Sequence, residues 1–297
     1  MKRTDSRNGG DETRHSFLSF PCLFEVTLLS YWKVLATIMV MVVAGLPAAS
    51  QADSPKKHRG PCEIHYPSDA TVEWDCRVIP PGGSLEAIFG EDWMDVARFN
   101  RIDRRHAHSG VSIKVPRRIE DLAQFTPLPP VYPPGELNQK FILIDLTEQF
   151  LGAYEFGALR FSAPIASGNG LNETPTGKFR LTAAHLQHQS GLYTIEGTDL
   201  PYPMNYALRF HVNREGVSYW IHGRDMPGYP ASHGCIGLYD EWMQKEQYGI
   251  PKEPELSDAQ KLFAWVLGSE PYDDRVIPLP RGPRVHIIGQ ASGHQLP

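Results

Sequence analysis

Long apolar runs and an excess of charge of one sign are both missing from this sequence. The formal net charge is −5 over 297 residues, so no global basic field predicts binding to nucleic acid. Residues 34–46 form an uncharged apolar run, but this run is shorter than the roughly 20 residues that a membrane-crossing helix needs. With 21% charged and 41% hydrophobic residues, the composition is that of an ordinary soluble globular protein.

The apolar run has the length and position of a signal-peptide core. It follows Lys33, and Ser50 and Ala52 behind it offer the small residues of a cleavage site. We therefore expect residues 1–52 to be a leader that is cleaved near Ala52 after export to the periplasm or cell envelope. The alternative is an uncleaved anchor in the inner membrane, which would be the only membrane contact.

Cysteine is also scarce, with four residues, and export affects whether each of them is expected to be removed, paired in a disulfide or free. Cys22 falls in the expected leader. Cys62 and Cys76 are close in sequence and are candidates for a disulfide that closes a short loop. Cys235 is then left over, and an unpaired thiol in an exported chain is either buried and inert or chemically active. Counting alone does not decide between the two.

Glycine and proline are abundant, with 26 of each, and with 10% aromatics they favour a β-rich chain with many turns. A polar segment precedes a small compact unit, a proline-rich stretch follows it, and a long β-rich region ends the chain. Proline-rich segments are semi-rigid, so we expect that stretch to space two domains apart. The predicted division after the leader is an extended segment 53–73, a small domain 74–120, a linker 121–138, a main domain 139–290 and a tail 291–297.

The small domain reads as strand, helix, helix, strand. Apolar alternation, the N-cap candidates Ser84 and Asp92 and the Gly82-Gly83 turn mark these elements. The predicted ranges are 76–79, 85–89, 93–99 and 111–116. The segment resembles a LysM domain, a βααβ module that binds N-acetylglucosamine-containing glycans. The residues that carry this resemblance are Val78, Gly82-Gly83-Ser84-Leu85, Ile88, Val96, Asn100, Gly110 and Ile113-x-Val115-Pro116.

The main domain reads mostly as short strands broken by glycine, proline and asparagine, which favours a sandwich or barrel-like sheet. The predicted strands are 140–145, 149–156, 159–166, 178–183, 207–212, 217–222 and 283–289. A short helix begins at 241–243, and Ser257 precedes a clearer helix over 258–267.

Two histidines and the unpaired cysteine lie together between Tyr219 and Leu238. His222 ends a predicted strand, and Ser232-His233-Gly234-Cys235 follows a loop. A cysteine nucleophile needs a nearby base because a free thiol has a pKa of about 8.5, and histidine is the usual partner. Gly234 lets the backbone turn sharply and bring N–H groups toward a developing oxyanion. From residue types alone, two alternatives stay open: a zinc site of His222, His233 and Cys235 with Asp225 or another histidine as fourth ligand, or simple packing.

The surrounding pattern resembles the L,D-transpeptidase (YkuD-type) catalytic domain over residues 139–290. The motif is Ile221-His222-Gly223, a loop, and then Ser232-His233-Gly234-Cys235-Ile236. Upstream segments that match in order are Ser167-Gly168, Glu173-Thr174-Pro175-Thr176-Gly177-Lys178-Phe179 and Met204-Asn205-Tyr206-Ala207-Leu208-Arg209-Phe210. The resemblance implies that the protein is mainly β, a β-sandwich catalytic domain preceded by the small α+β domain.

Residue roles follow from the same resemblance. Cys235 is the nucleophile, His222 is the base and the Gly223 carbonyl orients its imidazole. His233 shapes the oxyanion region and Ser232 positions the loop. Residues expected on the substrate side are Tyr206, Arg224 and Gly234. The sequence departs from the family at Gly237, where Arg or Asn is usual two residues after the cysteine, and Arg224 and Arg209 are candidates to supply the missing charge.

The implied reaction is acyl transfer on peptidoglycan. Cys235 attacks the L,D bond of a stem tetrapeptide, and an amine then accepts the acyl group, as in a 3→3 cross-link. The partners are stem peptides and glycan strands, and neither a metal nor an organic cofactor is expected. We expect a monomer. Water as acceptor would make the protein an L,D-carboxypeptidase, and a chain without activity would be a LysM-type wall-binding protein.

Overall fold

The computed structural model describes residues 60–195, 197–268 and 272–291. The predicted leader, the first seven residues of the segment 53–73 and residues 292–297 of the tail lie outside these ranges. Within the described residues, no helix is long and apolar enough to cross a membrane.

The N-terminal region has the predicted order of elements. Its elements are β1 (Trp74–Val78), α2 (Leu85–Phe89), α3 (Trp93–Asn100) and β2 (Ser112–Pro116), with a 3₁₀ turn η3 (Gly90–Asp92) between the helices. The two strands pair antiparallel. The Ser84 hydroxyl accepts a hydrogen bond from the Ala87 N–H at 3.2 Å, which is the cap that the sequence predicted for α2.

The segment before β1 is folded into turns, so the expectation of an extended segment is wrong for its described part. Two 3₁₀ helices occupy it, η1 (Pro61–Glu63) and η2 (Pro67–Thr71). Each begins with a proline, whose fixed φ suits the first position of a turn. The Asp69 carboxylate accepts the Tyr66 N–H at 2.8 Å and closes the second turn.

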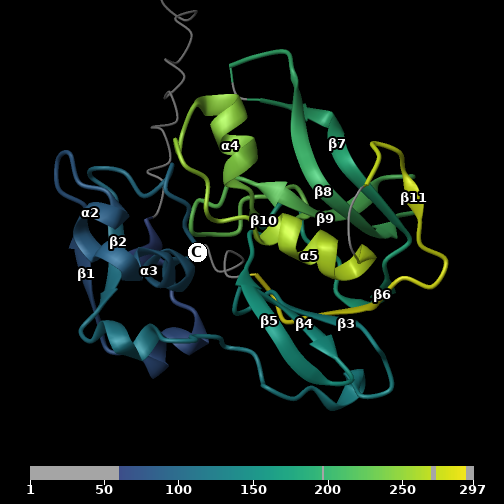
Figure 1. Ribbon diagram of the computed structural model, residues 1–297, viewed down its shortest axis with the longest axis horizontal. Coiled ribbons are helices and arrows are strands. Elements are labelled where there is room, and N and C mark those ends of the chain that lie inside the picture. The colour runs from purple at the N-terminus through teal and green to yellow at the C-terminus, as the bar shows by residue number, and fades with distance from the viewer. Residues whose placement is uncertain (1–59, 196, 269–271, 292–297) are drawn as a thin grey trace, which may run out of the picture. The chain divides into compact units, whose positions relative to one another are not determined.

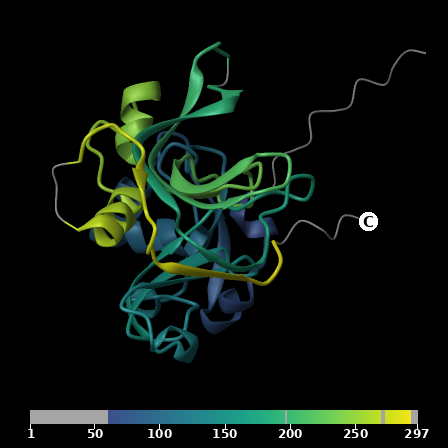
Figure 2. The same ribbon diagram turned by 90° about the vertical axis from the view of Figure 1, so that its right-hand side faces the viewer.

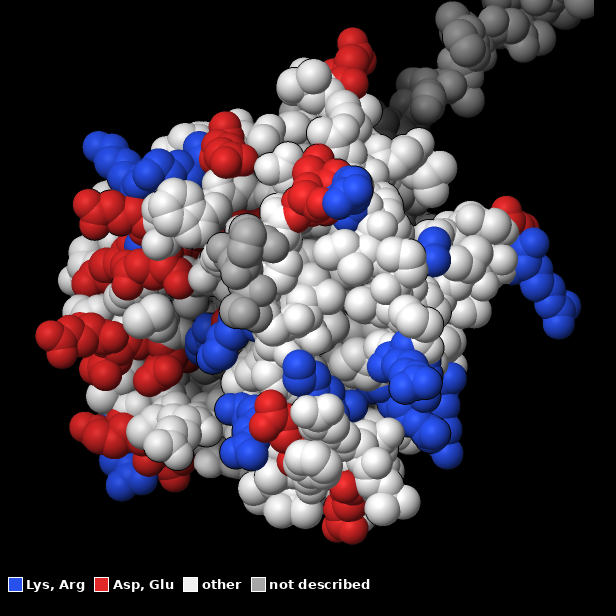
Figure 3. Space-filling model, turned by 45° about the vertical axis from the view of Figure 1, so that its right-hand side comes forward, with Lys and Arg blue, Asp and Glu red and all other residues white. Residues whose placement is uncertain are grey.

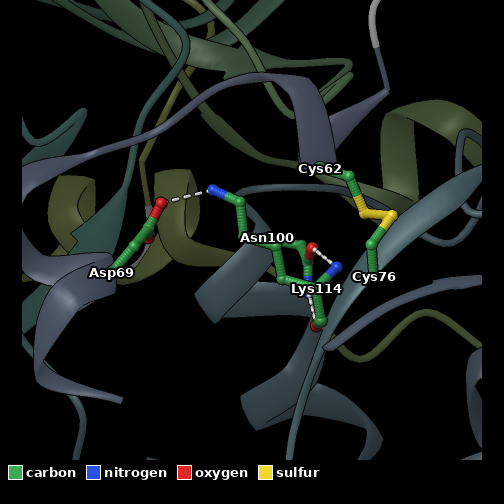
Figure 4. Close-up of a disulfide and its surroundings, with 5 residues drawn as sticks. All are labelled: Cys62, Asp69, Cys76, Asn100 and Lys114. Carbon is green, nitrogen blue, oxygen red and sulfur yellow. Dashed lines mark hydrogen bonds and ion pairs between the residues drawn. A yellow bond between two sulfur atoms is a disulfide. The ribbon is translucent and has the colours of Figure 1, made fainter. Parts of the chain in front are cut away.

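A disulfide and a buried ion cluster hold this segment against β1 and β2 (Figure 4). Cys62 and Cys76 are bonded, with their Cα atoms 5.8 Å apart. The fully buried Lys114 ammonium pairs with the Asp69 carboxylate, and the buried Arg101 guanidinium lies 3.2 Å from its other oxygen. Removing one member of such a buried pair typically costs about 3–5 kcal/mol, because it leaves an uncompensated charge.

The rest of the chain forms two five-stranded sheets. One has the order β10-β9-β8-β7-β11 and the other the order β5-β4-β3-β12-β6. Their strands are β3 (Phe141–Asp145), β4 (Phe150–Glu155), β5 (Ala158–Pro164), β6 (Gly177–Arg180), β7 (Ala183–Thr194), β8 (Pro201–Val212), β9 (Ser218–Arg224), β10 (Ile236–Tyr239), β11 (Ile277–Pro278) and β12 (Arg284–Ile288). Two helices accompany them, α4 (Glu241–Tyr248) and α5 (Asp258–Leu267).

The main core lies between the two sheets, with α5 inserted (Figure 1). Leu262 and Phe263 of α5 pack in one cluster with Ile142 and Val285 of one sheet and Leu208 of the other. After α5 the chain runs along β7 as β11 and then enters the second sheet as β12, as the yellow segment in Figure 2 shows. The protein is therefore mainly β, as predicted.

The proline-rich stretch does not hold two bodies apart, so the expectation of a spacer is wrong. Residues 121–138 pack on the second sheet, with η4 (Ile119–Leu122) and η5 (Pro133–Gly135) at either end. Leu122 and Leu128 are buried, and the Tyr132 N–H donates to the Gly157 carbonyl at 2.7 Å. Burial of Leu128 against the second sheet favours this docking.

The N-terminal region and the sheets share a second apolar cluster. Val96 and Phe99 of α3 pack there with Met226, Tyr239 and Leu256 from the larger region. The Tyr239 hydroxyl lies 3.0 Å from two carbonyl oxygens of the N-terminal region, those of residues 97 and 102. The small region is therefore part of one compact unit with the sheets.

Candidate active site

His222 is held on β9 with one ring nitrogen fixed. The side chain is buried, and its Nδ1 lies 2.8 Å from the Gly223 carbonyl oxygen. Because a carbonyl oxygen only accepts, Nδ1 must carry the hydrogen and Nε2 is left as the basic nitrogen. A Cβ at Gly223 would lie 2.3 Å from an Asp240 carboxylate oxygen, so glycine is required for this orientation.

Cys235 lies at the head of the neighbouring strand. It directly precedes β10, which pairs parallel with β9 beginning at Ile236 opposite Ile221. Side chains alternate along paired strands, so Cys235 lies on the face that carries Trp220 and His222. The thiol packs against a cluster that includes Trp220 and Met204. Among the described residues no hydrogen bond joins the thiol to His222, and such bonds often tighten only when substrate is bound.

The turn before Cys235 is built around Ser232 and Gly234. The Ser232 hydroxyl accepts the Gly234 N–H at 3.0 Å and donates to the Cys235 carbonyl. Gly234 has a φ of +105°, and a Cβ there would lie 2.7 Å from the Tyr219 ring. Both observations require glycine, and they explain why the motif has one at this position.

Two upstream motif segments support this turn. The Thr174 hydroxyl donates to the Gly234 carbonyl at 3.0 Å and accepts the Gly168 N–H at 2.9 Å. The Ser232 N–H donates to the Ser167 carbonyl at 2.9 Å. Ser167 is in turn held by Gln149, whose side-chain amide contacts both its N–H and its hydroxyl. Gln149 and Thr174 were not singled out from the sequence, although Thr174 lies in a quoted motif.

His233 lies at the exposed edge of the same turn. Its ring stacks on Tyr193 of β7, with centroids 3.9 Å apart and planes 22° from parallel. Tyr193 was also missed from the sequence, because only the long β7–β8 hairpin brings it beside the motif. The predicted residues His222, Ser232, His233, Gly234 and Cys235 are therefore brought together.

Burial dominates the electrostatics of the pair. It lowers the pKa of His222 to about 3, although the Gly223 carbonyl acts in the opposite direction. Burial raises the pKa of the Cys235 thiol, while hydrogen bonding to the Trp220 backbone and the Arg224 charge act to lower it. Near neutral pH both side chains are therefore uncharged, and His222 has the unprotonated form that a base requires.

A family model covers the region that contains this motif. Residues 139–287 match the family model described as the YkuD L,D-transpeptidase catalytic domain, about half of the chain. The chain belongs to the YkuD family. No curated protein sequence matches it significantly.

Solved structures of L,D-transpeptidases are similar to parts of this YkuD-family chain. One from Stackebrandtia nassauensis shares 19% identity, with 69% of this chain and 70% of that chain covered and a TM-score of 0.36. One from Xylanimonas cellulosilytica shares 23% identity, with 65% and 78% covered and a TM-score of 0.38. One from Mycobacterium smegmatis shares 18% identity, with 50% and 58% covered and a TM-score of 0.31.

The departure from the YkuD pattern at Gly237 has a structural counterpart in Arg224. A Cβ at Gly237 would lie 1.8 Å from Cδ and 2.1 Å from Cγ of Arg224, so the arginine stem fills the space of the missing side chain. The Arg224 Nε donates to the Asp225 carbonyl at 3.0 Å. Its charge influences both His222 and Cys235. A cation thus reaches this position from β9 instead of β10.

Two other predicted residues make different contacts. The Arg209 guanidinium lies 5.6 Å over the Trp220 ring and donates to the Thr182 hydroxyl, so Arg224 is the arginine beside Gly237. The Tyr206 ring packs edge-on against Phe263 of α5, with centroids 5.9 Å apart. The Tyr206 ring therefore packs with the core between the sheets.

Asp225, the fourth residue of the zinc alternative, belongs to a different cluster. Among the described residues, the group with metal-ligand spacing is Asp103, His106 and Asp225, without His222, His233 or Cys235. The carboxylate oxygens of Asp103 and Asp225 already accept hydrogen bonds from neighbouring residues. Both oxygens of Asp103 accept two hydrogen bonds each, and Asp225 accepts from Arg105, Tyr202, Gln244 and Tyr248. This donor set satisfies the acids without a metal ion.

The same cluster holds the loop between the base and the nucleophile. The Asp103 N–H donates to the Met226 carbonyl at 2.8 Å, and the Met226 N–H donates to the Asp103 carboxylate at 2.6 Å. The Tyr66 hydroxyl donates to the Gly228 carbonyl at 3.3 Å. The N-terminal region therefore braces the catalytic motif of the YkuD domain, a contact that the sequence did not predict.

Proposed function

We propose that this protein is a peptidoglycan L,D-transpeptidase that forms an acyl-enzyme on Cys235. The observation that carries the proposal is the pairing of β9 and β10. It sets Cys235 on the same face as His222, whose Nδ1 is fixed by the Gly223 carbonyl 2.8 Å away. Membership of the YkuD family supplies the reaction class, and peptidoglycan stem peptides are the substrate that it implies.

In the first step the Cys235 sulfur attacks the carbonyl carbon of the third stem residue. The thiol proton passes to Nε2 of His222 and then to the leaving amine, so terminal D-alanine departs as a neutral amine and a thioester remains. Because both groups are uncharged at rest, proton transfer accompanies attack instead of preceding it. Backbone N–H groups of this turn are proposed to stabilise the oxyanion, although the Gly234 N–H itself donates to the Ser232 hydroxyl.

In the second step an amine attacks the thioester, and His222 removes its proton. A peptide bond forms and the Cys235 thiol is restored. An amine on another stem peptide gives a 3→3 cross-link, and an amine on another wall component gives an attachment. Water in its place would give L,D-carboxypeptidase activity.

Other parts of the proposal rest on the sequence. The N-terminal residues are proposed to direct export to the periplasm or cell envelope. The LysM-like region is proposed to bind glycan strands and so raise the local concentration of stem peptides. The remaining alternative, a wall-binding protein without activity, was favoured by Gly237 alone, and the Arg224 stem in that space weakens it.

Muropeptide analysis tests the proposal. Isolated sacculi are incubated with wild type, Cys235→Ala and the matched exposed-site control Ser109→Ala. We expect new 3→3 cross-linked dimers with wild type and the control, and none with Cys235→Ala. Tripeptides without dimers would mean that water is the acceptor. Equal cross-linking by Cys235→Ala would refute the nucleophile.

A covalent probe gives an independent test. By family analogy a carbapenem such as meropenem acylates the cysteine. Mass spectrometry should therefore show one adduct on Cys235 in wild type, and no adduct in Cys235→Ala. An unmodified wild-type protein after long incubation would argue against a competent site.

A further inference from the structure

A second concave site lies apart from the catalytic motif. It is a cavity of about 530 Å³ between the start of β12, the end of β6, the segment around Lys140 and the end of α5. Four cationic side chains line it, and none of its described lining residues is acidic. These cations are Lys140, Arg180, Arg281 and Arg284.

Two of these cations face each other directly. Arg180 of β6 and Arg284 of β12 are opposite partners in an antiparallel pair, so their side chains leave the sheet on the same face. Like charges in this position destabilise a sheet. Two residues along, Lys178 is opposite His286, and its charge contributes to lowering the pKa of that histidine. Repulsion between these like charges therefore destabilises the strand pair, and a bound anion would reduce that repulsion.

The cations have no carboxylate partner among the described residues. Arg180 donates to the Gly282 carbonyl at 2.6 Å, and Lys140 donates to the Val266 carbonyl at 3.3 Å. The side chains of Arg281 and Arg284 form no hydrogen bond or ion pair with any described residue. Figure 3, turned toward the side on which β6 lies in Figure 1, shows a group of blue side chains on the right of this face without red ones beside it.

We propose that this cavity binds a phosphate-bearing anion. Arginine forks match the paired oxygens of a phosphate, and a multiply charged group offsets several cations better than one carboxylate does. The volume lies within the range of small-molecule sites, so it holds the phosphate together with the organic group that carries it. The ligand is a phosphate ester or pyrophosphate, whether soluble or as a lipid headgroup.

The cavity is separate from the acyl-transfer site. Arg284 begins β12, whereas Gly289, just after its end, lines a second, small cavity with Gly168 and Thr174, which support the catalytic turn. Four residue steps of strand, roughly 13 Å, separate the two ends of β12. Anion binding is therefore an additional property and does not depend on the proposed chemistry.

Binding of defined phosphates to the full chain tests the proposal. Titration calorimetry and thermal unfolding are run with pyrophosphate and with glycerol 3-phosphate, against sodium chloride of equal ionic strength. The variant is Arg284→Gln, and the matched control is the exposed Arg214→Gln, outside the cavity. We expect saturable binding to wild type and control, and affinity roughly tenfold or more weaker in Arg284→Gln.

A stability readout separates this role from a structural one. Without phosphate, Arg284→Gln should unfold at the same temperature as wild type or higher, because it removes the repulsion with Arg180. With phosphate, the wild-type midpoint should rise and that of the variant should rise much less. A lower midpoint of the variant in chloride alone would mean that Arg284 serves the fold and would overturn the proposal. Equal shifts of both proteins in phosphate would do the same.

Vesicles distinguish the source of the phosphate. Wild type and Arg284→Gln share the same N-terminal residues, so any contribution from these cancels in the comparison. Weaker binding of the variant to phosphatidylglycerol vesicles, with equal binding of both to phosphatidylcholine, would assign a lipid headgroup. Binding of soluble phosphates alone would assign a soluble ester. No difference between the two proteins with any of these probes would refute the site.

Discussion

Arg224 and Gly237 act as a matched pair on adjacent strands. The arginine stem lies where any side chain at position 237 would begin. The guanidinium is tied to the loop behind it, since Nε donates to the Asp225 carbonyl. The side chain usual in the family extends from position 237 on β10, whereas the Arg224 side chain of this protein extends from β9 into the same space. That space holds only one of the two.

Exchange of the two positions tests this pairing. Gly237→Arg alone should slow acylation of Cys235 by roughly 10- to 100-fold, because overpacking of a filled site costs about 1–3 kcal/mol. Adding Arg224→Ala should recover much of the rate, since it opens the space and the new arginine restores the charge. The measurement is the rate of meropenem adduct formation by mass spectrometry. Arg224→Ala alone is the control, and a harmless Gly237→Arg would contradict the prediction.

The buried His222 gives stability a defined pH dependence. Its folded pKa of about 3 lies below the ordinary unfolded value of about 6.5, so the unfolded chain binds a proton that the folded chain does not. This contribution is complete above pH 6.5 and is lost as pH falls toward 3. Between pH 8 and pH 5 we expect His222 to account for a loss of about 2 kcal/mol.

Denaturant titrations at several pH values measure that loss. The His222→Asn variant should show a shallower fall in the free energy of unfolding between pH 8 and pH 5. His188, whose pKa burial lowers to about 4, adds a smaller contribution in both proteins because it is only partly buried. The exposed His108→Gln serves as control and should keep the wild-type slope. An unchanged slope in His222→Asn would count against a neutral buried base.

At the scale of elements, the sequence predicted the helices whose bounds depend on neighbouring residues. Helix α2 was predicted with its observed bounds because Ser84 caps it, and α5 because its apolar residues recur at helical spacing. The strand β7 was missed. Its polar residues, among them Gln187, Gln189 and Ser190, do not mark a strand locally, and it exists because β8 pairs with it over a long hairpin.

In the candidate site too, residues of a local motif were predicted and residues that depend on long-range contacts were missed. The motif was sufficient to name His222, Ser232, His233, Gly234 and Cys235. The Arg224 stem over Gly237 could not be predicted, because it depends on the register in which Gly237 faces His222. The stacking of Tyr193 on His233 likewise needs the hairpin to exist first. Residues joined by strand register or by long-range docking leave no local signal in the sequence.

At the scale of the molecule, the shared core couples the N-terminal region to the catalytic loop. Met226 is buried among residues of α3 and also exchanges two backbone-directed hydrogen bonds with Asp103. The Tyr239 hydroxyl spans to the carbonyls of residues 97 and 102. Neither region can open without exposing apolar surface of the other, so we expect them to unfold together.

Urea unfolding checks this coupling. Far-UV circular dichroism and tryptophan fluorescence should give one coincident transition for the region from residue 60 onward. Tyr239→Phe should lower its midpoint by the equivalent of about 1–3 kcal/mol, because it removes the buried hydroxyl donor that lies 3.0 Å from the carbonyls of residues 97 and 102. Tyr193→Phe, which keeps its ring and lies at the exposed edge of the site, is the control. Two separated transitions in wild type would contradict a single cooperative unit.

The Cys62–Cys76 bond and the free Cys235 thiol coexist in one chain, and the raised pKa of the partly buried Cys235 makes that compatible. Thiol–disulfide exchange proceeds through the thiolate, and burial keeps the pKa of Cys235 high. We therefore expect the resting Cys235 thiol to be slow in thiol–disulfide exchange and in reaction with peroxide. Conditions that oxidise Cys62 and Cys76 should then leave Cys235 reduced and available for the proposed acyl transfer.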